Sequence, residues 1–91
     1  MRGDNKMKAV IFGFGENFDT QVANCTIYAM KEGYEIVGSY SDMGNLIGRI
    51  KDRDIDMVLL DKAMKPEYGN MGLMILGETI GRYGASAGIV E

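Results

Sequence analysis

The stretch GYEIVGSYSDMGNLIGRIKDRDIDMVLLD, residues 33–61, decides the fold class of this chain. Its β-branched and aromatic run at 34–40 predicts a strand. Ser41 or Asp42 then suits the N-cap of a short helix. Three apolar residues follow at helical spacing on the expected inner side: Leu46, Ile47 and Ile50. The apolar run at 55–60 predicts a fully buried strand, and a strand, a helix and a strand in this order indicate a parallel pair joined by a crossover.

Toward the N-terminus, the pattern adds one strand and one helix. The apolar run at 7–12 predicts a strand that ends in a tight turn at 13–15. Asp19 or Thr20 suits the N-cap of a helix over about 20–32, and the glycine after it can end the helix in the left-handed conformation. The expected inward residues are Val22, Ala23, Thr26, Ile27, Ala29 and Met30.

Toward the C-terminus, the pattern adds a third helix and a fourth strand. Pro66 suits the first turn of the helix, and Gly84 follows as a stop. The expected core-side residues are Met71, Met74, Ile75 and Ile80. The run ASAGIV at 85–90 predicts a strand. We therefore expect one α/β domain over residues 1–91: an open, mainly parallel four-stranded sheet in β-α-β-α-β-α-β order, with helices on its faces.

Composition restricts the class of protein. The chain has 91 residues, 46% hydrophobic and 25% charged, which suits a single core, and a domain this small gains stability from self-association. Its net charge of −3 disfavours independent DNA binding. With one cysteine and no histidine, we expect no disulfide within the chain, no metal site and a reducing, cytoplasmic setting. No stretch suits a signal peptide or a membrane span.

A family resemblance rests on QVANCTIYAMKEGYEIVGSYSD, residues 21–42, where a glutamine and a cysteine precede YA and a GYEIVG strand. Flanking runs agree: KAVIF at 8–12, IDMVLL at 55–60 and YGNMGLMILGETIGRYGASAGIVE at 68–91. Together they resemble the N-terminal catalytic domain of the serine recombinases, the resolvase/invertase family, in a degenerate and truncated form. The resemblance implies a resolvase-like fold.

The same resemblance locates an active site that this sequence does not fill. The family's Arg-x-Ser motif, with its nucleophilic serine, matches Phe14-Gly15-Glu16 here. Its arginine cluster after the third strand matches DKAMKPEY, residues 61–68, which offers Lys62 and Lys65 but no arginine. We therefore expect no catalytic residues. The resemblance, together with the missing active-site residues, implies a non-catalytic domain that acts through protein contacts, as a partner or regulator in DNA recombination or mobile-element processes.

Two other functions fit parts of the same sequence. A response-regulator receiver would place its phosphoacceptor at Asp61, although the carboxylate pair that holds magnesium is missing after the first strand. A nucleotide-binding protein would use the turn of Gly13 and Gly15, although the third glycine of the fingerprint is missing. No cofactor is expected in the leading hypothesis.

The candidate ligand-binding residues follow from these alternatives: Gly13, Gly15, Glu16, Asp61, Lys62 and Lys65. A cluster of Glu16, Asp19 and Asp61 would favour a cation site, whereas lysines converging on the glycine turn would favour an anion site. We expect Cys25 to be a small core residue, because no histidine is present to activate its thiol. We also expect the methionines of the third helix to fill the core.

Overall fold

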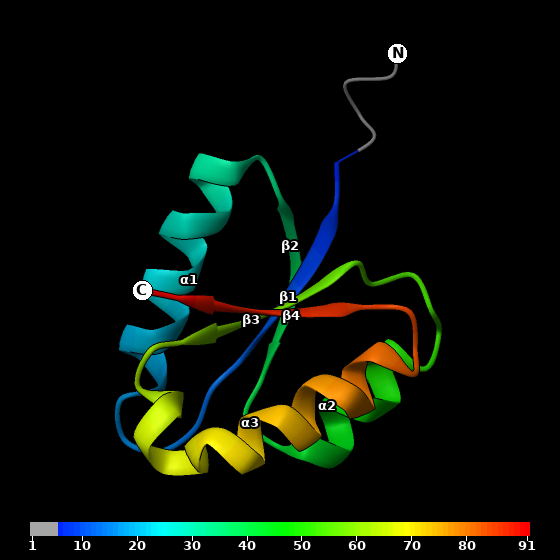
Figure 1. The fold of residues 1–91 in the computed structure, drawn as a ribbon. Helices are drawn as coiled ribbons and strands as arrows, with labels where there is room; N and C mark the ends of the chain where they lie inside the picture. The colour runs from blue at the N-terminus through cyan, green and yellow to red at the C-terminus, as the bar shows by residue number, and fades with distance from the viewer. Residues whose placement is uncertain (1–5) are drawn as a thin grey trace.

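A computed structural model describes residues 6–91 and shows four parallel strands in one sheet (Figure 1). The strands are β1 (Lys8–Phe12), β2 (Glu35–Tyr40), β3 (Met57–Asp61) and β4 (Ser86–Val90). Their order across the sheet is β2-β1-β3-β4, so β1 and β3 are central. This confirms the predicted α/β class, the parallel sheet and the alternation of strands and helices.

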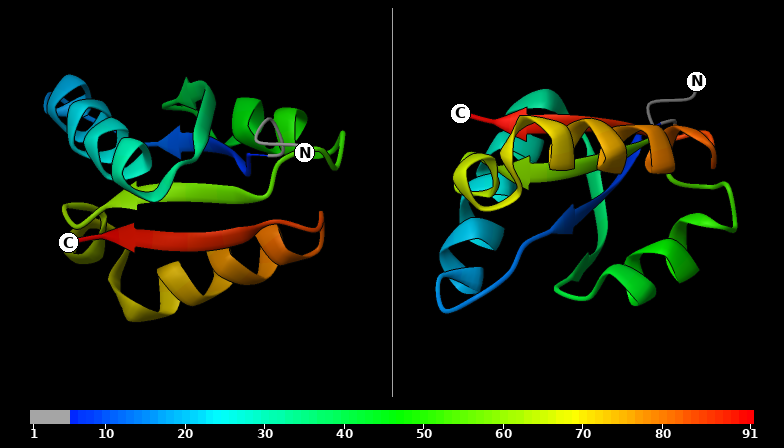
Figure 2. Two further views of the ribbon diagram at one scale, coloured as in Figure 1. Left: turned by 90° about the horizontal axis from the view of Figure 1, so that it is seen from above. Right: turned by 60° about the horizontal axis from the view of Figure 1, so that its bottom comes forward.

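Helix α1 (Phe18–Glu32) covers one face of the sheet, and the other two helices cover the opposite face (Figure 2). Gly33 ends α1 in the left-handed conformation, with φ of 78°, as predicted. The start of α1 differs from the prediction, which placed the N-cap at Asp19 or Thr20. The N-cap is Asn17, and its side chain makes no capping hydrogen bond.

The predicted inner face of α1 is partly wrong. Its buried residues are Gln21, Cys25 and Ala29, whereas Ile27 and Met30 are exposed. The small side chains of Cys25 and Ala29 let the helix lie close to β1 and β3. Gln21 turns inward because its amide bonds the loop after β1. Ala23 is exposed as well, and only Ala29 of the predicted inward residues is fully buried.

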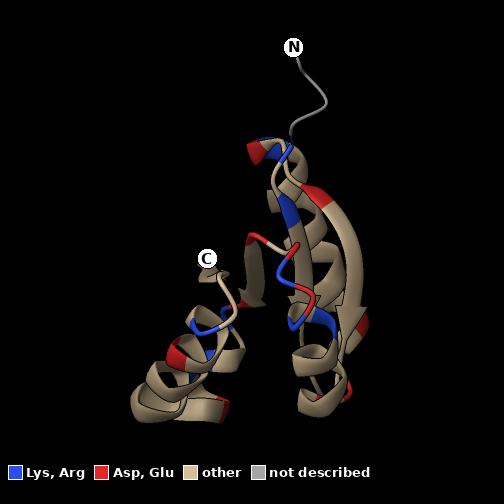
Figure 3. Cartoon of the chain, turned by 90° about the vertical axis from the view of Figure 1, so that its right-hand side faces the viewer, with Lys and Arg blue, Asp and Glu red and all other residues tan. Residues whose placement is uncertain are grey.

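Helix α2 (Met43–Ile50) lies on the opposite face, and its Leu46 and Ile50 are buried, as predicted. Its N-cap is Asp42, whose Oδ2 accepts a hydrogen bond from the Asn45 backbone N–H at 3.0 Å. The loop after α2 carries positive and negative side chains in alternation (Figure 3). Arg49, in the last turn of α2, donates two hydrogen bonds to the carboxylate of Asp54 in this loop.

Helix α3 (Met64–Gly81) shares this face with α2 and carries Pro66 in its first turn, as predicted. Its expected core side is wrong for three residues. Ile80 is buried, but Met71, Met74 and Ile75 are exposed, and Leu73 and Leu76 face the core instead. Apolar residues occupy both sides of this helix, so spacing alone does not distinguish the inner one. No helix within residues 6–91 is long and apolar enough to cross a membrane.

Candidate functional site

The connections place the candidate site where the strand order reverses. The chain leaves β1 for β2 on one side, then returns to β3 on the other side of β1. The helices after β1 and β3 therefore lie on opposite faces of the sheet. Open α/β sheets bind ligands at the carboxyl ends of the strands at such a point. The relevant segments here are the loop at 13–17 after β1 and the segment at 61–63, which begins with the last residue of β3.

The loop after β1 is held by the side chain of Gln21. Its Oε1 accepts a hydrogen bond from the Phe14 N–H at 3.1 Å, and its Nε2 donates one to the Phe14 carbonyl at 3.0 Å. A Cβ atom at Gly13 would lie only 2.5 Å from that Oε1, so glycine is required here for the amide to fit. Gly15, with φ of 79°, then turns the chain toward α1.

Phe14 and Glu16 have opposite surroundings in this loop. The Phe14 ring packs edge-on against Tyr68 of α3, with 6.4 Å between ring centroids, and Phe12 packs against the same tyrosine at 6.3 Å. Phe14 thereby joins the larger core cluster. Glu16 is exposed to solvent. The middle of the loop therefore presents an aromatic contact toward α3 and a carboxylate toward solvent.

The end of β3 is built around Asp61, which is only 5% exposed. Its Oδ1 accepts a hydrogen bond from Asn24 Nδ2 at 3.1 Å, and its Oδ2 accepts one from the Ala63 N–H at 3.0 Å. The carboxylate thus joins α1 to the turn that starts α3. Burial, and secondarily the negative charge of Asp61, raises the pKa of the Cys25 thiol to about 12. This agrees with the prediction that Cys25 is a core residue.

Two amide side chains of α1 therefore bind the two loops of the site. Gln21 holds the loop after β1, and Asn24, three positions later, holds Asp61. Sequence analysis did not identify either amide as a site residue. The available signal was their spacing, because residues three apart lie on the same side of a helix.

A hollow of about 420 Å³ opens beside Asp61, between α1 and the end of β4. Its lining residues come from three elements: Asn24, Ile27, Tyr28, Lys31, Asp61, Lys62, Val90 and Glu91. Lys31 and Lys62 bring two ammonium groups to this surface. Lys65 is not among the lining residues, although it forms an ion pair with Glu91, which is one of them.

The predicted ligand-binding residues do not form one group. Asp61 and Lys62 share the hollow, whereas Gly13 and Gly15 belong to the separate loop after β1. Glu16, Asp19 and Asp61 do not come together as a cation site. Within the part of the chain that the structure describes, no group of three His, Cys, Asp or Glu side chains is placed to hold a metal ion. The receiver and nucleotide-binding hypotheses stay predictions.

Comparison with solved structures identifies the architecture. The C-terminal catalytic domain of ISC1926 TnpA, an IS607-like serine recombinase, superposes with a TM-score of 0.77 and 22% identity over 93% of this chain and 68% of that one. The fold is resolvase-like. A resolvase family site-specific recombinase from Streptococcus pneumoniae gives the same TM-score, with 18% identity over 93% of this chain and 72% of that one. No family model and no curated protein matches the sequence.

Proposed function

We propose that this resolvase-like domain is non-catalytic and acts through contacts with other protein chains, in processes linked to DNA recombination or mobile elements. The link to recombination comes from the structural neighbours, which are a serine recombinase and a site-specific recombinase. The absence of catalysis comes from the residues at the strand ends. The two parts rest on different observations, and the test below addresses the absence of catalysis.

The observation that carries the proposal is the loop after β1. By the family resemblance, Phe14 and Glu16 occupy the places of the arginine and the nucleophilic serine. Phosphate transfer to a serine needs a hydroxyl that attacks and cations that hold the phosphate oxygens. Here the first position is an aromatic ring packed on Tyr68, and the second is an exposed carboxylate that repels phosphate. Neither residue supplies the required chemistry.

The segment after β3 supports the same conclusion. Lys62 and Lys65 stand where the resemblance implies arginines. A lysine lacks the planar fork that holds two phosphate oxygens at once, and Lys65 is already paired with Glu91. The buried carboxylate of Asp61 beside Lys62 makes the surface less favourable for an anion.

The proposal is tested by incubating the purified chain with supercoiled plasmid and quenching with detergent. We expect no nicked circles and no protein covalently attached to DNA. A Glu16→Ser variant is the matched control, because it restores a hydroxyl at the nucleophile position without restoring the arginines. We expect it to be inactive as well. An active serine recombinase acting on its own site verifies the assay. Nicked plasmid carrying covalently bound wild-type chain would overturn the proposal.

A further inference from the structure

One side of helix α1 borders the hollow beside Asp61. Four residues of this helix line the hollow: Asn24, Ile27, Tyr28 and Lys31. The last three follow the first by three, four and seven positions, so the four form one stripe on the helix surface. Ile27 is 55% exposed although its side chain is apolar. The Tyr28 ring packs edge-on against Tyr34, with 6.2 Å between ring centroids. The stripe therefore presents an apolar surface with an amide at one end and an ammonium group at the other.

The charged side chains that line the hollow leave a local excess of positive charge. Glu91 lines it but is paired with Lys65. Asp61 is almost fully buried, and both of its oxygens already accept hydrogen bonds. Lys31 and Lys62 are exposed, and within the part of the chain that the structure describes neither has an ion-pair partner. Two ammonium groups thus accompany one shielded carboxylate, although the whole chain carries a net charge of −3.

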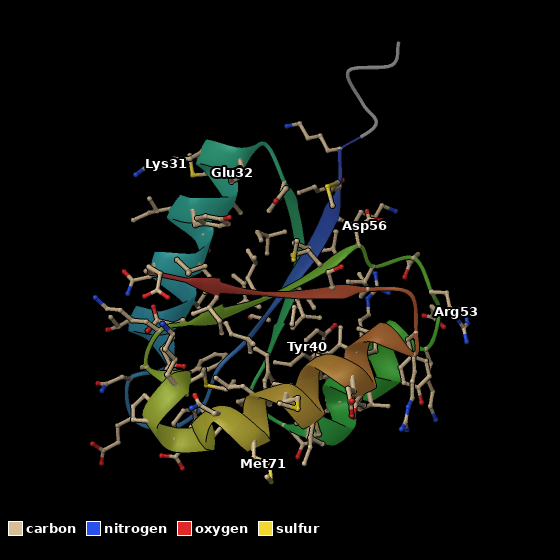
Figure 4. All side chains as sticks on the ribbon, viewed as in Figure 1. Lys31, Glu32, Tyr40, Arg53, Asp56 and Met71 are labelled. Carbon is tan, nitrogen blue, oxygen red and sulfur yellow. The ribbon has the colours of Figure 1, made fainter. Side chains whose placement is uncertain are left out.

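The separation of the two lysines suits a short extended segment. Asn24 donates a hydrogen bond to Asp61, the residue before Lys62, so this end of the α1 stripe lies beside Lys62. Lys31, whose side chain projects outward from the last turn of α1 in Figure 4, lies two helical turns farther on, about 10 Å along the helix. Alternate side chains of an extended chain share one side, and three of them span about 13 Å. The flexible lysine side chains bridge the difference between these two lengths.

We propose that the hollow binds an extended segment of a partner protein in which an apolar side chain lies between two acidic ones at alternate positions. The acidic side chains pair with Lys31 and Lys62, and the apolar side chain covers Ile27 and Val90. This inference rests on the proposed function, because it specifies the chemistry of the protein partner. Single carboxylates suit this surface better than a phosphate, since the Asp61 carboxylate repels a doubly charged group more strongly.

The first test is an NMR titration of the isotope-labelled chain with the peptide acetyl-Glu-Ser-Leu-Ser-Glu-amide. We expect the amide shifts to be concentrated in α1 and at the ends of β3 and β4. The matched peptide with glutamine in place of both glutamates should bind on the order of tenfold more weakly, because it loses two ion pairs.

Three outcomes of this titration would overturn the proposal. They are equal binding of the two peptides, no shifts around the hollow, and shifts concentrated in α2 and α3. Inorganic phosphate serves as a further probe. If it produced the same shifts at the same concentration as the acidic peptide, the hollow would be a simple anion site and the proposal would also be wrong.

The second test removes each contact from the protein. Lys31→Gln and Lys62→Gln should each raise the dissociation constant of the acidic peptide about threefold, and the double variant about tenfold, because the two ion pairs are separate. Lys51→Gln is the matched control, since this exposed lysine follows α2 on the other face of the sheet. Ile27→Ser should also weaken binding, whereas Met30→Ser, on the same helix but outside the hollow, should not. Circular dichroism checks that each variant is folded.

The controls and the plasmid assay separate the possible failures. Equal weakening by Lys51→Gln or Met30→Ser would contradict binding in the hollow. A chain that neither nicks plasmid nor binds the acidic peptide would remove this inference alone. Nicking by a chain that binds the peptide in the hollow would overturn the proposed function alone.

Discussion

The Gln21 amide contributes to stability through two hydrogen bonds to one residue, Phe14. Truncation in Gln21→Ala leaves a partly buried N–H and carbonyl without these partners. We expect the free energy of unfolding to fall by about 2 kcal/mol, measured by urea denaturation. Asn17→Ala removes an amide from the same segment that makes no capping bond, so it should change little. Equal losses in the two variants would contradict this account of the loop.

Cys25 provides a second test at the residue scale, because burial raises the pKa of its thiol from 9.0 to about 12. At pH 8 the native thiol should react slowly with an aromatic disulfide reagent and react at once in concentrated urea. A Met30→Cys variant supplies an exposed thiol that should react immediately in the native state. Rapid labelling of two thiols in that folded variant would show that Cys25 is accessible.

The same pKa has a consequence for stability at high pH. Between pH 9 and 12 the unfolded chain loses the Cys25 proton while the folded chain keeps it. The contribution of this group to the free energy of unfolding therefore falls as pH rises, by at most about 1.4 kcal/mol per pH unit. Below pH 9 both states are protonated, and this group adds no pH dependence. The difference between wild type and Cys25→Ala, measured across this range, isolates the effect.

Among the elements, α2 depends most on its cap, because it has only eight residues. The Asp42 side chain satisfies the Asn45 N–H, whereas Ser41 is exposed and precedes the cap. Asp42→Ala should lower the free energy of unfolding by about 1 kcal/mol, and Ser41→Ala should change it little. Thermal or urea unfolding distinguishes them. A larger loss of stability in Ser41→Ala than in Asp42→Ala would place the N-cap at Ser41.

The helices also show what periodicity predicts and what it does not. Spacing predicted all three helices, and it predicted the buried Leu46 and Ile50 of α2. It failed for α3, where Gly69, with φ of 72° and ψ of 172°, interrupts the helix after its first turn. The segment after the break takes its orientation from Leu76 and Ile80 packing on the sheet.

For the whole molecule, burial distinguishes the central strands from the edges. Nearly every residue of β1 and β3 is buried, whereas β2 has only exposed and partly buried residues and β4 has one buried residue, Val90. Amide hydrogen exchange should therefore be slowest in β1 and β3, because their exchange requires opening of the sheet. Mass spectrometry of peptide fragments measures this. Equal protection of β2 would show that the outer edge is also covered in solution.

The arrangement of layers also explains where the open surfaces lie. Helix α1 is the one helix on its face of the four-stranded sheet (Figure 2). It contacts β4 only weakly, which leaves the hollow beside Asp61. Two helices cover the other face, and the groove lies between them. Both surfaces follow from packing three helices on four strands. The first lies beside the candidate site, and the second lies on the opposite face of the sheet.

The sequence by itself determined the order of elements, the parallel sheet, a cap at Ser41 or Asp42, the stop at Gly33 and the likeness to serine recombinases. These properties depend on neighbouring residues, since caps, turns and apolar runs act over a few positions. Tertiary structure decided which sides of α1 and α3 are buried and which polar groups meet. Asn24 and Asp61 are 37 positions apart, and only the packing of α1 across the sheet brings them within hydrogen-bond distance. The exposed Met71, Met74 and Ile75 have the same origin, because a helix with two apolar sides can bury only one against the sheet.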